Sequence, residues 1–191
     1  MRKAVLMLTV LAGTACSHRV ALEGPQASRA TLSAMPGWYR KPPNDDKWLF
    51  SPATATSQDV QIAINKAQAE GRAGLASQLE IKYGALTRRF VEETGIARDA
   101  QLLTEYEQTY KGVVSEVLVG SRAKEQTFGI DAGVYRAWVL MELPVGEASK
   151  KLLEQLRAQE QMYTRFRATE AFKELNAEVD KYDKWKAGQK P

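Results

Sequence analysis

The chain of 191 residues is poor in the side chains that most often carry chemistry, because it holds one cysteine, Cys16, and one histidine, His18. A single cysteine cannot form an internal disulfide. Residues beyond His18 contain neither a thiol nor an imidazole, which excludes from them Ser-His-Asp and Cys-His catalysis and the usual zinc sites. The sequence also shows no glycine-rich phosphate loop. We therefore expect no cofactor, no metal and no enzymatic activity.

The chain has little excess charge of either sign. It carries 27 lysines and arginines against 23 acidic residues. Removal of residues 1–15, for which the reasons follow below, takes away Arg2 and Lys3 and leaves 25 basic residues against 23 acidic ones. A surface so balanced produces no field that attracts phosphate groups. Nucleic acid is therefore not an expected partner.

One short apolar run stands near the N-terminus, directly after Arg2 and Lys3. As a helix, residues 4–12 would rise only about 14 Å against a hydrocarbon core of roughly 30 Å, so the run is too short to cross a membrane. Its length is typical of the apolar region of a secretory signal peptide. Small residues follow at 13–15, and then comes Cys16.

Residues 11–16 (Leu-Ala-Gly-Thr-Ala-Cys) resemble a lipobox, the sequence at which the lipoprotein signal peptidase cleaves before a cysteine that receives lipids. Gly13 stands where that pattern prefers leucine. We expect residues 1–15 to be a signal peptide and the Cys16 thiol to be acylated, since two or more acyl chains anchor a protein stably where one does not. The alternative is an ordinary signal peptide followed by a cysteine of no special role.

The first half of the remaining chain predicts a tether, a strand and a helix. Residues 16–36 contain two prolines and no sustained period, which is typical of a flexible tether. A strand is expected at residues 47–51, continuing toward residue 55. Thr56 or Ser57 is then expected to cap a helix that ends near residue 82, and a further strand is expected at 83–92.

The helix after this strand has an unusually small face. Ala67, Gly71 and Gly74 recur along it at spacings of three or four residues. A glycine inside a helix costs about 1 kcal/mol relative to alanine. These positions therefore predict a close approach of the helix to a sheet.

The second half predicts a helix and then a β-hairpin. The helix is expected at residues 97–119, and the hairpin at 122–128 and 134–143 with a turn at 131–133. Apolar residues occupy both faces of the segment 134–143, which is typical of a central strand. Pro144 ends this strand, and helical periodicity then extends from residue 146 to residue 187.

The order of these small and aromatic residues resembles the LPP-twenty family of small outer-membrane lipoproteins, over about residues 37–143. The resemblance rests on the motifs Trp38-Tyr39, Pro42-Pro43, Trp48-Leu49-Phe50, Ala53-Thr54-Ala55, Gln61 with Ala63, residues 73–80, residues 118–121 and residues 134–137. The chain departs from the family at Ser51-Pro52, where glycine-rich residues are usual. The resemblance implies an α+β fold with a small antiparallel sheet packed on helices, an outer-membrane location and no enzymatic activity. Ser17 agrees with the location, since aspartate there would signal retention in the inner membrane.

The helical segment in the C-terminal extension, residues 144–191, is predicted to be one long helix with two apolar stripes. The phase of the stripes slips near Ala168-Thr169, which predicts a bend or a change of packing partner there. Our hypothesis is that the first half lies on the sheet and the second half pairs with another protein or a second copy of the chain. The alternative is that the whole segment folds back on its own domain. The four apolar positions that would contact the partner are Phe172, Leu175, Val179 and Tyr182.

Three further groups of residues are candidate sites, each with a simpler interpretation that we favour. The neighbouring glutamates 92/93 and 105/107 do not face each other on a helix and are expected to be solvated. The arginine pairs 88/89 and 165/167 are suited to carboxylate or phosphate groups but are expected to pair with Glu92, Glu160 or Glu170. Trp38-Tyr39 has the composition of a recognition patch but is expected to pack over the sheet edge.

Taken together, these residues predict a lipid-anchored outer-membrane lipoprotein that acts as a non-catalytic interaction or structural module of the cell envelope. Its expected partners are membrane lipid, through Cys16, and an envelope protein or a second copy. The alternative function is a carrier of a small ligand. A carrier would need a cavity of about 300 Å³ or more between sheet and helices, lined by Tyr83, Tyr106 or Trp138.

Overall fold

The computed structural model describes residues 29–95 and 100–188. The predicted signal peptide, Cys16 and the first part of the predicted tether lie outside the described residues. The last part of the predicted tether contains a short helix, α1 (Arg29–Ala34), and α2 (Gly37–Arg40) follows the predicted tether. The Thr31 hydroxyl of α1 donates a hydrogen bond of 2.6 Å to Asp131 in the sheet. This contact is between residues far apart in the sequence, so the local composition gave no sign of it.

The sheet has three antiparallel strands in the order β1-β3-β2. They are β1 (Trp48–Ser57), β2 (Arg122–Asp131) and β3 (Val134–Pro144). The central place of β3 is confirmed, and its residues 137–143 are all buried. The predicted hairpin is confirmed as well. Its turn residues Ala132 and Gly133 have φ angles of 50° and 82°, the left-handed pair that suits the twist of a two-residue hairpin.

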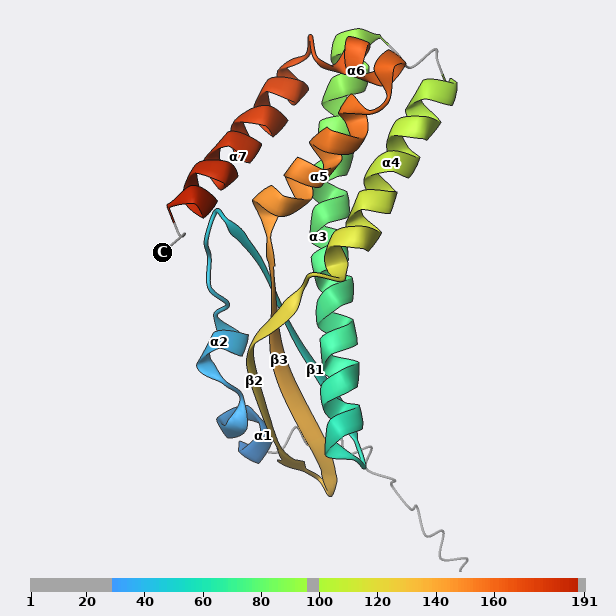
Figure 1. Ribbon diagram of the computed structural model, residues 1–191. Coiled ribbons are helices and arrows are strands. Elements are labelled where there is room, and N and C mark those ends of the chain that lie inside the picture. The colour runs from blue at the N-terminus through green and yellow to red at the C-terminus, as the bar shows by residue number, and fades with distance from the viewer. Residues whose placement is uncertain (1–28, 96–99, 189–191) are drawn as a thin grey trace, which may run out of the picture.

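One long helix, α3 (Val60–Thr94), spans the length of the molecule (Figure 1). Its N-cap is Asp59, whose carboxylate accepts a hydrogen bond of 2.9 Å from the Ile62 amide. The prediction of Thr56 or Ser57 as the cap is wrong, because β1 continues through both residues. The helix ends at Gly95, which has a φ angle of 63°.

The predicted strand at residues 83–92 is wrong, because α3 continues through this segment. Tyr83, Leu86 and Phe90 recur every three or four residues and are buried on one side of the helix. Thr87 is accommodated because its hydroxyl donates to the Tyr83 carbonyl at 2.7 Å. Packing of the aromatic residues against other helices outweighs the weak helix propensity of Gly84 and Thr87.

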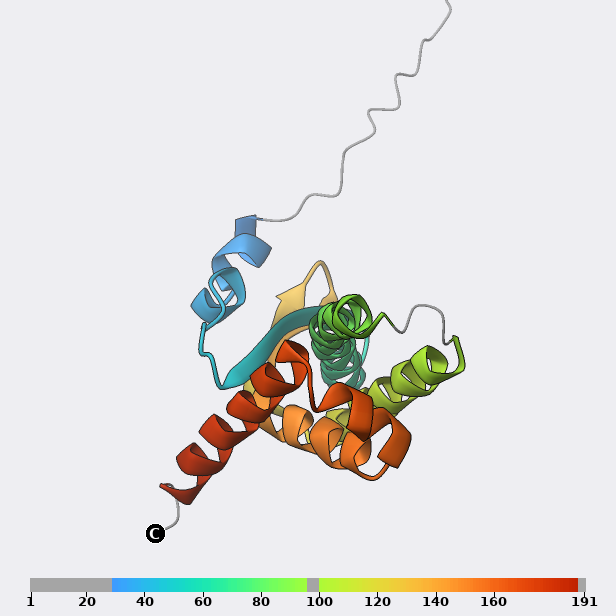
Figure 2. The same cartoon turned by 90° about the horizontal axis from the view of Figure 1, so that it is seen from above.

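The first half of α3 covers one face of the sheet, as its small residues predicted. A Cβ atom on Gly71 would overlap Met141 of β3, and one on Gly74 would overlap Ser51 of β1. The opposite face of the sheet carries α1 and α2 (Figure 2). On that face Trp138 and Leu140 of β3 are buried.

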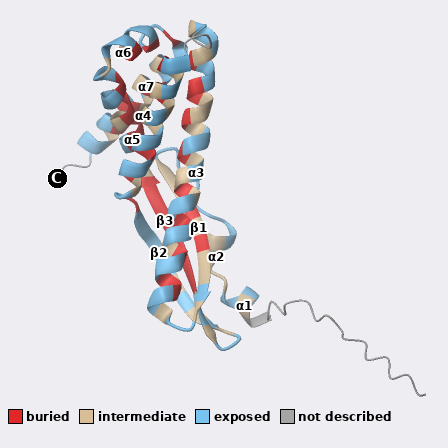
Figure 3. Cartoon of the chain, turned by 90° about the vertical axis from the view of Figure 1, so that its right-hand side faces the viewer, coloured by how far each residue is buried: buried red, intermediate tan, exposed pale blue. Residues whose placement is uncertain are grey.

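The second half of α3 belongs to a helical end of the molecule, beyond the sheet (Figure 1). The other helices there are α4 (Ala100–Leu118), α5 (Val145–Arg157), α6 (Glu160–Phe166) and α7 (Glu170–Ala187). Phe90, Tyr106 and Phe166 pack together there, with ring centroids 5.1–5.8 Å apart. Buried residues run along α3 from the sheet into this end without a break (Figure 3).

The C-terminal segment is helical, as expected, but it is divided into three helices, of which the last, α7, is the longest. The predicted phase slip near Ala168-Thr169 marks the start of α7, where the Thr169 hydroxyl accepts a hydrogen bond of 3.1 Å from the Phe172 amide. The expectation that the first half lies on the sheet is wrong, because α5 packs against α4 and α7. Residues 145–187 share one core with α3 and are therefore part of the domain rather than an extension of it.

The α+β class with a small antiparallel sheet packed on helices and a long C-terminal helix, α7, is confirmed. In the part of the chain that the structure describes, no helix has an apolar stretch long enough to cross a membrane.

Candidate functional site

The predicted lipidation site, Cys16, lies outside the described residues, and so does His18. Within residues 29–95 and 100–188, no group of three or more acidic, histidine or cysteine side chains is arranged to hold a metal ion. The neighbouring glutamates are not buried. Glu93 accepts a hydrogen bond of 2.6 Å from the Glu170 amide and so helps to cap α7, while Glu107 pairs with Lys111 at 3.6 Å. These contacts are structural.

The basic residues on α3 hold α7 in place. Arg89 forms an ion pair with Glu174, and the ion pair raises the pKa of Arg89. Lys82 contacts both carboxylate oxygens of Glu178, at 2.5 and 2.6 Å. Arg89 is thus paired with a carboxylate, as we favoured, although its partner comes from α7 and not from the glutamates nearest in sequence.

The four predicted partner contacts on α7 are used inside the chain itself. Leu175, Val179 and Tyr182 are buried against the molecule's own helices, and Phe172 packs on Phe166 with ring centroids 5.6 Å apart. Gly146 at the start of α5 allows the close approach, since a Cβ atom there would overlap Tyr182. The assignment of these four residues to a partner is therefore corrected. The break before α7 lets the helix turn back along α5, which was the alternative expectation.

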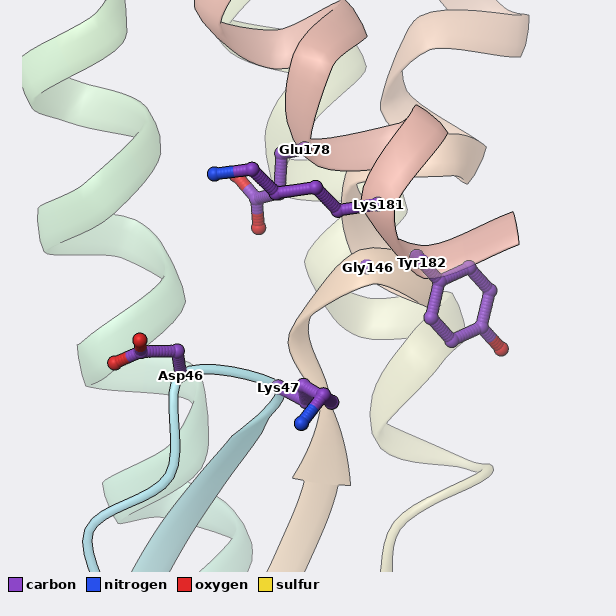
Figure 4. A pocket seen from close by; sticks show the side chains of 6 residues that line it. All are labelled: Asp46, Lys47, Gly146, Glu178, Lys181 and Tyr182. Carbon is purple, nitrogen blue, oxygen red and sulfur yellow. The ribbon is translucent and has the colours of Figure 1, made fainter. Parts of the chain in front are cut away.

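A hollow of about 290 Å³ lies where α7 meets the start of β1 and of α5 (Figure 4). It is lined by Asp46, Lys47, Gly146, Glu178, Lys181 and Tyr182. Two acidic and two basic side chains face the hollow, so it does not favour a ligand of either charge. Its volume is at the small end of ligand pockets, which hold about 300–1,000 Å³. Lined mainly by charged side chains, this hollow has the composition of a polar junction between elements.

A larger groove of about 630 Å³ runs along the outer edge of β1. Tyr39 of α2 lines one side of the groove, and residues 51–55 of β1 form its floor. The other side is lined by Lys66, Glu70 and Gly74 of α3. Because β1 is an outer strand, the groove gives access to a backbone edge that has no neighbouring strand. Pro52 removes one donor from this edge. A groove of this kind suits an extended segment of a protein partner, which can add a strand to the sheet.

The sequence identified Tyr39 as part of a candidate recognition patch, but it did not predict the groove along β1. Trp38 and Tyr39 are half-buried and pack on each other with ring centroids 6.3 Å apart, in a helix that contacts β1 and β3. This agrees with packing over the sheet edge. The signal for the groove was Pro52, because proline within a strand indicates an outer strand.

The three aromatic residues expected to line a carrier cavity are buried. Tyr83, Tyr106 and Trp138 are each 3% exposed or less, and none of them lines either hollow described above. Burial raises the pKa of the Tyr83 and Tyr106 hydroxyls above the usual value. Tyr83 shares a hydrogen bond of 3.4 Å with Ser149, whereas the Tyr106 hydroxyl has the Thr87 side chain as a polar neighbour but no partner with hydrogen-bond geometry among the described residues. The residues chosen for the carrier function are thus core residues.

No model of a known protein family matches the chain, and comparison with curated proteins finds no match either.

Proposed function

We propose that the chain is a lipid-anchored lipoprotein of the outer membrane whose folded domain acts by binding another component of the cell envelope, without catalysis. The observation that carries the proposal is the solitary Cys16 behind a short apolar run and three small residues. The resemblance to the LPP-twenty family supports the same location. The absence of histidine and cysteine after residue 18 supports a binding role over an enzymatic one.

The anchor is tested by substituting Cys16 and following the lipid. Wild-type protein expressed with radiolabelled palmitate should carry the label and remain with the membrane after a high-salt wash. Cys16→Ser should lose the label, because serine offers no thiol for acylation. A control, Ser17→Ala, should keep it. A Cys16→Ser protein that is exported and still partitions into detergent would contradict the anchor.

The binding role belongs, in our proposal, to the groove along β1. The floor of the groove is a strand edge, and the side formed by α3 carries the exposed charges of Lys66 and Glu70. The partner is a protein with an extended segment, because only a backbone can pair with a backbone edge over several residues.

A photo-crosslinking amino acid at Lys66 tests this site in intact cells. Lys111 on α4 is the matched control, since it is an exposed lysine on a helix outside the groove. We expect a discrete adduct from position 66 and none of that size from position 111. The substitution Thr54→Asp in the groove floor should abolish the adduct. Equal adducts from both positions, or an adduct that survives Thr54→Asp, would contradict the groove as the binding site.

A further inference from the structure

The exposed apolar side chains of the domain gather at one end of it. Seven large apolar residues are exposed in the part of the chain that the structure describes, and five of them belong to α1, to the first turn of α3 or to the β2–β3 hairpin. These elements lie together at the sheet end of the molecule, opposite α6 (Figure 1). The five are Leu32, Ile62, Phe128, Ile130 and Tyr135, and the other two are Ile81 and Val119.

The centre of this group is a short row on the hairpin. Phe128 and Ile130 alternate along β2 and therefore point to the same face of the sheet. Tyr135 is paired with Ile130 across the hairpin and points to that face as well. Phe128 is 57% exposed and Ile130 is 75% exposed. Aligned apolar side chains of this size mark an interaction surface more often than scattered ones do.

The fold leaves this row uncovered for a geometric reason. The first half of α3 lies mainly over β1 and β3. The Gln68 side chain of α3 reaches β2 at Gln126, with a hydrogen bond of 3.2 Å. Beyond this contact the strand extends past the helix, and its side chains on that face meet solvent. The carboxylate next to the row, Asp131, forms an ion pair with Arg136 at 2.8 Å and accepts a hydrogen bond from the Thr31 hydroxyl.

The place where the described chain begins indicates what covers the row. The described chain begins with α1 at the sheet end, beside the hairpin. The 13 residues from Cys16 to Arg29 span at most about 45 Å even when fully extended. The 35 residues of α3 are about 52 Å long and carry the helical end away from that point. An anchor on Cys16 therefore holds the sheet end of the domain close to the bilayer.

We propose that the sheet end, through Phe128, Ile130 and Tyr135, docks on the lipid surface to which Cys16 is anchored. This inference rests on the proposed lipid anchor. The tether brings the row to the bilayer at high effective concentration, so that weak insertion of three side chains is enough to orient the domain. The groove along β1 and the helical end then point away from the headgroups toward other envelope components.

A fluorophore on a single new cysteine tests the docking. The acylated full-length protein is reconstituted into vesicles of phosphatidylethanolamine and phosphatidylglycerol. Ile130→Cys carries an environment-sensitive dye, and Ile81→Cys is the matched control, because Ile81 is 69% exposed in the middle of α3. We expect the dye at position 130 to shift to shorter wavelength. A lipid-bound nitroxide should also quench it at least twice as strongly as the dye at position 81.

Each other result identifies a different failure. If the protein is acylated and pellets with vesicles but the two dyes respond alike, docking of the sheet end is refuted while the anchor stands. If the protein carries no acyl chain and does not pellet, the proposed function itself has failed. If the dye at position 130 is shielded without vesicles, in proportion to protein concentration, the outer edge of β2 pairs with a second copy and the lipid surface is the wrong occupant.

Discussion

At the scale of single residues, two buried tyrosines in the helical end differ in one hydrogen bond. Tyr83 and Tyr106 are both fully buried, but only the Tyr83 hydroxyl has a partner with hydrogen-bond geometry, Ser149. A buried polar group without a partner costs about 1–3 kcal/mol. Tyr106 thus contributes its ring to the cluster with Phe90 and Phe166 while its hydroxyl opposes folding.

Replacement of the two hydroxyls should therefore have opposite effects. Tyr106→Phe should leave the free energy of unfolding unchanged or raise it by about 1 kcal/mol. Tyr83→Phe should lower it by about 1 kcal/mol, because the buried Ser149 loses its partner. Chemical denaturation of both variants measures the difference. A larger loss for Tyr106→Phe than for Tyr83→Phe would mean that the Tyr106 hydroxyl is satisfied after all.

The same tyrosines should make stability fall in alkaline solution. Burial raises the pKa of both hydroxyls in the folded state above the usual value of about 10. Their contribution to stability is complete below pH 10. Above it the contribution declines, because only the unfolded chain releases these protons. The decline is about 1.4 kcal/mol per pH unit for each tyrosine.

Denaturation between pH 8 and pH 11.5 measures this slope. The double variant Tyr83→Phe/Tyr106→Phe should show a shallower decline than the wild type. Titrating lysines affect both proteins equally, so the comparison isolates the tyrosines. Parallel curves for the two proteins would contradict a raised pKa at either position.

At the scale of elements, the glycines of α3 serve different purposes in its two halves. Gly71 lies against the sheet, where a Cβ atom would overlap Met141. Gly84 lies in the second half, with nothing within 4 Å of the place a Cβ would take. The first glycine is required by packing, whereas the second only weakens the helix.

Alanine at the two positions should accordingly change stability in opposite directions. Gly84→Ala should raise the free energy of unfolding by about 0.5–1 kcal/mol, because alanine loses less backbone entropy in a helix. Gly71→Ala should lower it by about 1–3 kcal/mol through overpacking. Thermal denaturation of both variants is the measurement. A stabilising Gly71→Ala would show that α3 does not approach the sheet closely.

The C-terminal helix α7 is, by its burial, an element of the core. Leu175 is fully buried and belongs to the same hydrophobic cluster as Leu152 and Phe166. Leu175→Ala should therefore cost about 2–5 kcal/mol in the isolated chain, while Lys173→Ala, on the exposed side of α7, should cost nearly nothing. If Leu175→Ala leaves the melting temperature of the isolated protein unchanged, α7 serves a partner and not the core.

At the scale of the whole molecule, the domain has a sheet end and a helical end joined by α3 (Figure 1). The exposed apolar row belongs to the sheet end, and the buried aromatic cluster belongs to the helical end. Neither end depends on a thiol or an imidazole, because the described residues contain neither. The stability of the domain is therefore expected to come from packing, hydrogen bonds and ion pairs.

A chelator and a reductant test that expectation on the intact domain. Excess EDTA and dithiothreitol should leave the melting temperature unchanged within the error of calorimetry. Hydrophobic packing and surface ion pairs respond to neither reagent. A fall of several degrees with EDTA would reveal a carboxylate metal site that the fold depends on.

What the sequence by itself determined is local in origin. The turn at Ala132-Gly133, the central place of β3, the small face of α3 and the break near Thr169 each follow from residues within a few positions of one another. The lone Cys16 and the lack of later histidine and cysteine likewise need no coordinates. These features depend on turn geometry, periodicity and composition, which neighbouring residues set.

Only the tertiary structure decided which residues far apart in the chain contact one another. The local pattern of residues 83–92 predicts a strand, whereas the packing of Phe90 on Tyr106 and Phe166 favours the helix that forms. The stripe on α7 is covered by α5, and the exposure of Phe128 and Ile130 depends on how far α3 reaches across the sheet. Such contacts join residues tens of positions apart. Their energy comes from apolar surface that two segments bury together, so neither segment alone shows it.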